Sequence, residues 1–225
     1  MTTDFTFSKS LLSEQVEKAL IAEILSGKVK PGQRIDLNAY RQLWSMSITP
    51  LRDAVRVLET AGLVEVSPRR GVFVSKLDGN SMKEIFEIRI ALECMAVELA
   101  TSRVPETEAR DTLDAYLRAR ATKKGKSRKQ LLDLVDLRIH DLCLKHCGNE
   151  RLRRMMEGIR DLVILSQRTI VRMLNEPLET TLPEHIAIAE AVCARDAPRA
   201  SRAMGAHLRS TLQRITTFLD SRVDE

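Results

Sequence analysis

The chain contains four histidines, and the helices predicted around three of them bring those three together. His185 and His207 lie in the last two helical segments, and each stands eleven residues from the corner at Asp196. Because an α-helix rises about 1.5 Å per residue, both side chains are expected about 16 Å from that corner in an antiparallel pair. Asp136 and His140 stand four residues apart, which places them on one face of a helix. Three imidazoles and one carboxylate are therefore predicted to meet at one depth in a helical bundle.

Nitrogen and oxygen donors of this kind suit a divalent transition metal, with Zn²⁺ expected first and Ni²⁺, Mn²⁺ and Co²⁺ as alternatives. The predicted ligands are Asp136, His140, His185 and His207. The same spacing also fits core histidines whose hydrogen bonds are satisfied within the protein. Cys143 and Cys147 share the face of His140 and are the main rival ligands, whereas His146 points elsewhere. We expect the two cysteines to pack as small hydrophobic residues, as buried thiols in a reducing cell usually do.

No catalytic set accompanies these ligands in the sequence. There is no serine or cysteine visibly paired with an activating histidine, no glycine-rich phosphate loop and no nucleotide-binding fingerprint. We therefore expect the protein not to be an enzyme. A metal with open coordination positions could still activate water, which leaves a metal-dependent hydrolase with an appended DNA-binding domain as the alternative.

The stretch from Ser47 to Val66 has the pattern of a short helix followed by a strand. Thr49 is expected to cap the helix and Pro50 to take its first position, where a missing N–H costs nothing. Gly62 is expected to end the helix. The apolar positions at helical spacing are Leu51, Val55, Leu58 and Leu63. A capped helix followed at once by a hairpin is typical of a DNA-recognition helix and its wing.

Candidate DNA contacts lie on this helix and in the hairpin. Arg52 and Arg56 stand four residues apart on the polar face. Segments 63–66 and 71–74 alternate as strands around a tip at 67–70, where Arg69 and Arg70 are expected to meet phosphates or the minor groove. A solvated turn is the alternative for these two arginines. The predicted DNA-binding residues are Ser47, Ile48, Thr49, Arg52, Arg56, Arg69, Arg70 and Gly71.

The elements that must position these residues divide the chain into two domains. Helices are predicted at 10–26 and 37–44, and the second of them leads within a few residues to the helix after Ser47, which is the spacing of a helix-turn-helix. The predicted domains are a winged helix-turn-helix at 1–76, a linker at 77–81 and an all-helical domain at 82–225. Six amphipathic helices are predicted at 80–103, 106–123, 127–147, 149–174, 180–195 and 197–221. The fold class is therefore mainly α, with an antiparallel helical bundle after the winged domain.

The composition and charge are typical of a soluble globular protein. The net charge of +5 and a pI near 9.2 permit a nucleic-acid partner without requiring one. Residues 118–129 hold seven basic side chains and no acid; we expect a solvated loop there, with a DNA-backbone contact as the alternative. The N-terminus has no signal-peptide pattern, and no apolar stretch approaches the roughly 20 residues of a membrane span. We expect a cytoplasmic protein with no membrane partner.

The first 75 residues resemble the GntR family of bacterial transcription regulators. The family pattern runs roughly Ser-Arg-Thr-Pro-Val-Arg-Glu-Ala-Leu-Arg-Arg-Leu-Glu-x-x-Gly-Leu-Val, followed by a wing that ends in Gly-x-Phe-Val. The matching residues are Ser47, Thr49, Pro50, Arg52, Ala54, Arg56, Leu58, Glu59, Gly62, Leu63, Val64, Gly71, Phe73 and Val74. The segment from Ile24 to Gly32 also resembles the family's Ile-x-x-Gly-x-x-x-Pro-Gly. The resemblance implies a homodimer on a pseudo-palindromic, double-stranded operator.

The rest of the chain resembles the all-helical effector domain of the FadR-like subfamily, the FCD type. The matching segments are Phe86–Glu93, Asp136–His140, Glu184–Ile188 and Ala203–Leu208. In metal-binding members an Asp and three His occupy these motif positions, and a small carboxylate effector commonly binds at the metal. The resemblance implies that Arg89 meets the charge of that effector. Its alternative role is an ion pair with Glu87 or Glu93, and the alternative for the domain is an empty metal site that responds to an acyl ligand.

Two positions depart from the family pattern on the predicted DNA face. Ile48 stands where the family has arginine, and Asn38 stands where some relatives carry a DNA-contacting arginine. Both changes remove positive charge and hydrogen-bond donors. We therefore expect an operator unlike the family's usual one, with methyl or shape contacts near Ile48 in place of a guanine contact.

Overall fold

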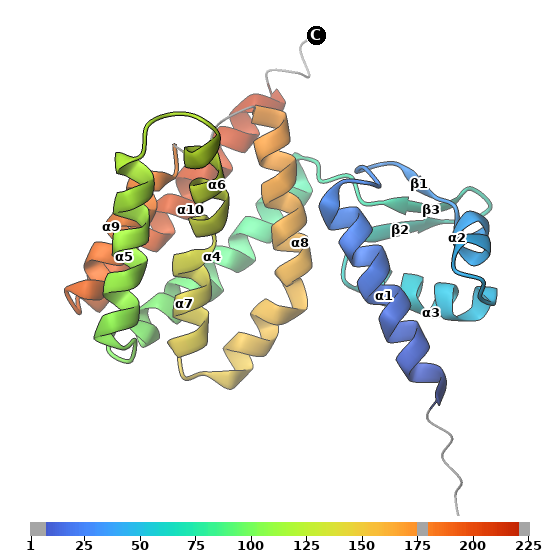
Figure 1. Cartoon of the computed structure of the whole chain (residues 1–225), viewed down its shortest axis with the longest axis horizontal. Coiled ribbons are helices and arrows are strands. Elements are labelled where there is room, and N and C mark those ends of the chain that lie inside the picture. Colours follow the sequence, from blue (N-terminus) through green and yellow to red (C-terminus); the bar gives the residue numbers. More distant parts are fainter. Residues whose placement is uncertain (1–7, 175–179, 221–225) are drawn as a thin grey trace, which may run out of the picture. The chain divides into compact units, whose positions relative to one another are not determined.

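The computed structural model describes residues 8–174 and 180–220, which form helices and one small antiparallel sheet (Figure 1). They divide into two compact units. The first comprises the described residues up to Leu77 together with Gly158–Arg168, and the second comprises the others. The predicted fold class, a winged helix-turn-helix followed by an all-helical bundle, is confirmed. Within the described residues, no helix is both long enough and apolar enough to cross a membrane.

The described residues of the first unit up to Leu77 form a three-helix winged domain with an aliphatic core. Its helices are α1 (Ser8–Ser26), α2 (Leu37–Leu43) and α3 (Ile48–Thr60), and its strands are β1 (Arg34–Ile35), β2 (Val64–Ser67) and β3 (Gly71–Val74). The strand order is β1-β3-β2, and both pairings are antiparallel. Helix α3 packs against α1, α2 and β2. All four residues of its predicted apolar stripe, Leu51, Val55, Leu58 and Leu63, are buried, so the opposite face of α3 is left to solvent.

The start of α3 differs from the prediction by one or two residues. The helix begins at Ile48, and Ser47 is the N-cap residue, without a capping hydrogen bond from its side chain. Thr49, which was expected to cap the helix, lies inside its first turn. Pro50 therefore occupies the third helical position. It is tolerated there because the first four N–H groups of a helix have no partner within the helix.

The predicted end of α3 at Gly62 is confirmed, and its hydrogen bonds show why glycine stands there. Ala61 closes the helix, and Gly62 follows with a positive φ of 73°. The N–H of Leu63 donates to the carbonyl of Leu58 at 2.9 Å, and the N–H of Gly62 donates to that of Glu59 at 3.0 Å. These two bonds form a Schellman motif, which needs a left-handed residue at the position of Gly62. The motif turns the chain directly into β2.

The wing hairpin is confirmed, with a third strand beside it that the sequence did not predict. Strand β2 continues through Ser67, which pairs with Gly71, so the turn consists of residues 68–70. Arg34 and Ile35 form the additional strand β1, paired with Phe73 and Val72 of β3. Two residues are too few to show the alternation of apolar and polar side chains by which a strand is read from sequence.

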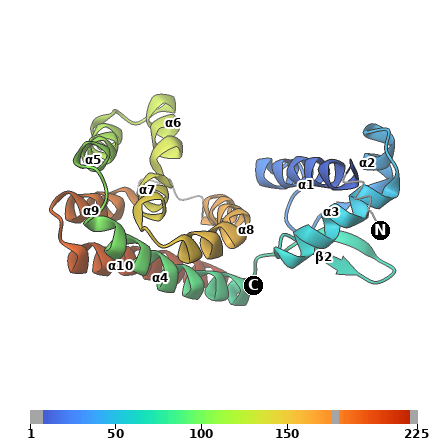
Figure 2. The ribbon, with the colours of Figure 1, turned by 90° about the horizontal axis from the view of Figure 1, so that it is seen from below.

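The second unit is an antiparallel bundle to which seven described helices contribute, α8 without its segment Gly158–Arg168. They are α4 (Gly79–Thr101), α5 (Glu106–Ala121), α6 (Lys126–Val135), α7 (Arg138–His146), α8 (Glu150–Leu174), α9 (Leu182–Cys193) and α10 (Ala197–Asp220). Helix α4 packs most extensively against α10, which also packs against α9 (Figure 2). Gly205 is buried where α10 packs against α4, and a Cβ atom there would lie 2.8 Å from Nη2 of Arg209 and 3.2 Å from Sγ of Cys94. Helices α7 and α5 pack against α4 and α9 respectively.

Two predicted boundaries of this unit are corrected. The helix expected at 127–147 is two helices, α6 and α7, separated by a turn at Asp136 and Leu137. The hydroxyl of Tyr116 on α5 accepts a hydrogen bond from the N–H of Ile139 at 3.0 Å, so a partner from another helix satisfies the new helix start. In addition, α4 begins at Gly79, with the side chain of Asp78 capping it through Ser81 N–H at 2.8 Å. Residues 79–81, expected in the linker, are therefore helical.

We predict that Gly62→Ala lowers the free energy of unfolding by about 1 kcal/mol, because an L-residue is strained at positive φ. The measurement is calorimetric unfolding of the full chain. Gly158→Ala is the matched control: Gly158 lies in α8 with no atom within 4 Å of an added Cβ. Alanine there should stabilise the helix by up to about 1 kcal/mol. Equal effects of the two substitutions would contradict the role given to Gly62.

Candidate functional site

The structure brings together the three histidines that the spacing singled out. His140 lies on α7, His185 on α9 and His207 on α10, and all three side chains are buried. The Nε2 atom of His185 lies 3.4 Å from Nε2 of His140 and 3.3 Å from Nε2 of His207. The three donor atoms lie within 4.8 Å of one another. The equal distance of His185 and His207 from the α9–α10 corner therefore does place them at one level.

These separations fit a shared metal ion. Two nitrogen ligands at about 2.0–2.1 Å from Zn²⁺, seen at the tetrahedral angle, stand about 3.3–3.4 Å apart. The two Nε2–Nε2 distances have these values. Three neutral imidazoles that face one another through nitrogen also lack the hydrogen-bond donors to satisfy each other fully. The donor set thus fits a divalent cation bound by three imidazoles, with room in the coordination shell for a further ligand.

Carboxylates lie behind two of the three rings. Glu93 of α4 contacts Nδ1 of His140 through Oε2, and Glu184 of α9 contacts Nδ1 of His207 at 2.7 Å. Neither carboxylate was predicted as part of the site, although both fall inside the motif segments quoted from the sequence. Their spacing to the histidines, 47 and 23 residues, carries no local signal. Only the packing of α4 against α7 and of α9 against α10 brings the pairs together.

The protonation states of these groups suit metal binding. Burial lowers the pKa of His207 to about 4, although the hydrogen bond to Glu184 opposes the shift. Burial and the neighbouring histidines lower the pKa of His185 well below its ordinary value. Burial alone would raise the pKa of Glu93, but the Arg89 guanidinium and His140 hold it well below its usual range. Neutral imidazole nitrogens are the form of histidine that binds a metal.

The fourth predicted ligand, Asp136, lies outside the group of converging donor atoms. Because α6 ends at Val135, Asp136 stands in the turn before α7 and does not share one helix with His140. Burial raises the pKa of Asp136, while His140 and Arg89 oppose that shift. The side chain of Asp136 is thus close enough to His140 and Arg89 for their charges to affect its pKa. Its role as a ligand stays a prediction.

The two cysteines and His146 are also placed apart from the three Nε2 atoms in the described structure. Burial raises the pKa of the Cys143 thiol, which keeps it in the protonated form that binds metals poorly. Cys147 is buried, and its Sγ contacts the carbonyl of Leu144 at 3.2 Å. His146 contacts Glu108 at 3.1 Å instead of the other histidines. These placements agree with the expectation that the two thiols serve as packing residues.

Arg89, the predicted effector contact, is paired inside the protein. Its side chain is 2% exposed, and its Nε donates to Glu93 Oε1 at 2.7 Å. The guanidinium also stacks over the ring of Phe86, 4.9 Å from the centroid. Of the two carboxylates considered as alternative partners, Glu93 is the one in contact. A residue four positions away faces Arg89 on a helix, whereas Glu87, two positions away, does not.

The predicted DNA contacts lie on the solvent side of the first unit. Arg52 and Arg56 of α3 are exposed, and the Arg56 guanidinium lies 3.7 Å from the Asp53 carboxylate. Arg69 and Arg70 are exposed at the turn of the wing, where Arg69 has a φ of 64°. The remaining four, Ser47, Ile48, Thr49 and Gly71, are exposed or half-buried. Every predicted DNA contact is thus accessible.

A further basic residue of the wing was missed because its strand was missed. Arg34 on β1 is exposed, and its guanidinium lies within 2.9 Å of where a Cβ on Gly71 would stand. This proximity places Arg34 beside the base of the hairpin turn. Asn38, at the start of α2, is also exposed, and its N–H donates to the capping Asp36 at 2.9 Å.

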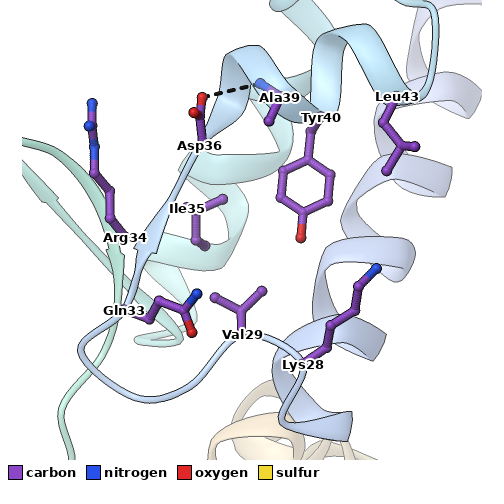
Figure 3. A pocket seen from close by; sticks show the side chains of 9 residues that line it. All are labelled: Lys28, Val29, Gln33, Arg34, Ile35, Asp36, Ala39, Tyr40 and Leu43. Carbon is purple, nitrogen blue, oxygen red and sulfur yellow. Dashed lines mark hydrogen bonds between the residues drawn. The ribbon is translucent and has the colours of Figure 1, made fainter.

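A pocket of about 460 Å³ lies in the first unit between the end of α1, β1 and α2 (Figure 3). Two of its polar groups already have partners within the domain: Tyr40 contacts Glu23, and Asp36 caps α2. None of its lining residues belongs to the histidine cluster, which lies in the other unit. We assign it no ligand.

The basic stretch 118–129 spans the end of α5, a loop and the start of α6. Arg128 donates to the carbonyls of Arg120 and Thr122 at 3.0 and 2.8 Å, so it fastens this loop. Arg118 and Arg120 are exposed. The arrangement fits the expectation of a solvated connection between helices.

Two family models match the chain: "Bacterial regulatory proteins, gntR family" over residues 12–74 and "FCD domain" over residues 84–210. The HTH-type transcriptional repressor GlaR of Escherichia coli is 30% identical over 195 residues, covering 83% of this chain and 87% of that protein. The HTH-type transcriptional regulator YdhC of Bacillus subtilis is 29% identical over 203 residues, covering 88% of each. A solved structure of a transcriptional regulator from Rhodococcus sp. RHA1 shares the fold, with a TM-score of 0.73 at 18% identity over 91% of this chain and 97% of that one.

We predict that His185→Ala abolishes stoichiometric metal binding, because His185 is the ring whose Nε2 contacts both of the others. The measurement is elemental analysis of purified protein after dialysis against Zn²⁺. His146→Ala is the matched control, since His146 pairs with Glu108, and it should keep the wild-type metal content. Metal retained by His185→Ala at the wild-type level would show that the cluster is not the binding site.

Proposed function

The chain belongs to the GntR family of bacterial regulatory proteins and carries an FCD domain. We propose that the binding of a small carboxylate effector changes its affinity for its operator DNA. The protein is a DNA-binding transcriptional regulator and not an enzyme. The observation that carries the proposal is the buried cluster of His140, His185 and His207 inside the FCD domain. A regulator needs a site for its ligand besides its DNA face, and the convergence of three imidazole nitrogens supports placing that site at this cluster.

The proposed effector site holds a divalent metal ion, with Zn²⁺ expected first. His140, His185 and His207 would bind it through Nε2, and Asp136 is proposed as the fourth ligand. Such an ion would supply a Lewis-acidic contact for a carboxylate oxygen. Three imidazole ligands bring no negative charge and Asp136 would bring one, so a bound divalent ion would keep a net positive charge and favour an anionic effector.

Arg89 remains in the proposal as a source of positive charge beside this site. Its guanidinium contributes to lowering the pKa of both His185 and His207, so its charge reaches the cluster. Its Nε is occupied by Glu93. A carboxylate effector would meet the field of Arg89 in addition to that of the ion.

On the DNA side we propose a homodimer on a pseudo-palindromic operator. Two α3 helices would then read half-sites about 34–36 Å apart, one helical turn of DNA. The proposed contacts are Ser47, Ile48, Thr49, Arg52, Arg56, Arg69, Arg70 and Gly71, exposed or half-buried on α3 and the wing. Ile48, half-buried at the start of α3, offers a methyl surface and no donor, which favours thymine methyl or shape contacts near it.

The effector mechanism is tested by operator binding at fixed ionic strength, with Zn²⁺-loaded and chelator-treated protein and a panel of small mono- and dicarboxylates. At least one carboxylate should change the operator Kd of the loaded protein, by about tenfold or more for a coupling above 1.4 kcal/mol. The same compound should have no effect on chelated protein or on His185→Ala. Metal below a few tenths of an equivalent, with a response to acyl ligands instead, would support the empty-site alternative.

We predict that Arg52→Ala weakens specific operator binding by about 1–3 kcal/mol, the usual cost of losing a base-contacting arginine. The measurement is the Kd for a footprinted operator against that for unrelated DNA. Arg110→Ala is a matched control, because Arg110 is an exposed arginine of α5 that pairs with Glu106. If Arg52→Ala bound the operator as tightly as the control does, α3 would not be the recognition helix in the proposed orientation.

A further inference from the structure

We propose that Glu93 and Glu184 are positioning residues of the histidine cluster, each fixing one imidazole so that its Nε2 faces the shared centre. The assignment rests on the proposed metal centre. It goes beyond that centre in naming two carboxylates that touch neither the ion nor the effector. Two arginines, Arg89 and Arg214, complete the arrangement by holding the carboxylates in place.

The first series of contacts connects α4 with α7. Glu93 is buried and divides its two oxygens between two partners: Oε1 accepts from Nε of Arg89 at 2.7 Å, and Oε2 contacts Nδ1 of His140. An ionised carboxylate can only accept hydrogen bonds, so the contact requires the proton of the neutral ring to sit on Nδ1. The lone pair of His140 then lies on Nε2, the atom 3.4 Å from Nε2 of His185.

The second series of contacts repeats the pattern between α9 and α10. Glu184 Oε2 lies 2.7 Å from Nδ1 of His207, and its Oε1 accepts from Nη1 of Arg214 at 3.3 Å. Arg214 is itself held by Ser210 and Thr211 at 2.7 and 2.9 Å. The order arginine, carboxylate, imidazole is therefore the same in both series of contacts. This agreement between two unrelated pairs of helices is what a site with a required imidazole orientation would show.

These two series of contacts orient the rings of His140 and His207, and His185 lies between them. Its Nε2 contacts the Nε2 of both, and its ring lies 5.5 Å from that of Tyr116. An imidazole with its proton on Nε2 cannot bind a metal through that atom. Outer carboxylates that fix the ring are typically worth about 10–100-fold in metal affinity. Two of the three ligands would thus be set in the binding tautomer before any ion arrives.

The two series of contacts differ in how deeply their carboxylates are buried, and this difference sets the expected order of the effects on Zn²⁺ affinity. The side chain of Glu93 is 3% exposed and that of Glu184 is 25% exposed. Water can replace part of what Glu184 supplies but cannot reach His140 in the same way. We therefore expect Glu93→Gln to lower Zn²⁺ affinity by about 100-fold and Glu184→Gln by about tenfold.

The first experiment measures Zn²⁺ affinity of the full chain by competition with a chromophoric chelator, for wild type, Glu93→Gln, Glu184→Gln and the double variant. Glu106→Gln is the matched control, because Glu106 also pairs with an arginine but is exposed on α5; its affinity should equal that of wild type. Glu184→Asp should recover part of the affinity lost by Glu184→Gln. Should Glu93→Gln fail to fold with Arg89 left unpaired, the Glu184 variants still decide the assignment.

The second experiment reads the tautomers in metal-free protein from long-range ¹H–¹⁵N correlations of the imidazole nitrogens. Only four histidines contribute to the spectrum, and His146 serves as internal reference. His140 and His207 should carry the proton on Nδ1 in wild type, and each should lose that pattern only when its own glutamate is replaced. A purely structural role for the glutamates would leave the tautomers unchanged.

The outcomes separate this assignment from the proposed function. A wild-type protein that takes up no Zn²⁺ overturns both. A wild type that binds Zn²⁺ while Glu93→Gln and Glu184→Gln bind it equally well overturns the positioning role alone. Reduced affinity together with loss of the Nδ1–H tautomer in the matching ring supports it.

Discussion

The second unit depends on burying an arginine, carboxylates and three imidazoles in an aliphatic core without leaving the charges uncompensated. An isolated buried charge costs more than a few apolar contacts return, so each must find a partner of opposite sign. Arg89 and Glu93 meet this requirement within one helix, and Glu93 also contacts His140 on α7. The helices around the cluster are therefore held in register by polar contacts as well as by packing. Moving any one of them would separate partners that have little access to water.

The two units treat charge in opposite ways. In the winged domain the core is aliphatic and the arginines of α3 and the turn are exposed, where positive charge can attract a phosphate backbone. In the helical bundle the polar groups converge inward, where a low dielectric strengthens every contact with a bound ion or anion. One chain thus exposes its positive charge in the first unit and buries its paired polar groups in the second.

Some of this arrangement could be predicted from the sequence, and the reason lies in the range of the interactions. Helix periodicity and the equal distance of His185 and His207 from one corner depend only on local geometry, and both predictions agree with the structure. The break between α6 and α7 could not be read in this way, because the hydroxyl of Tyr116 on another helix supplies the partner for the N–H of Ile139. The same holds for β1, which exists only by pairing with β3. The contact of Glu93 with His140 likewise depends on how α4 packs against α7.

Gly205 connects the packing of two helices with the placement of the histidine cluster. It stands two residues before His207, where α10 lies so close to α4 that any side chain would meet Cys94. Admitting even a methyl group here requires Cys94 to shift by a few tenths of an ångström and the end of the Arg209 side chain to move aside. The spacing of α4 and α10 at Gly205 therefore leaves little room for a larger residue two positions before His207. At this position the choice of residue is limited by the close approach of the two helices that carry Glu93 and His207.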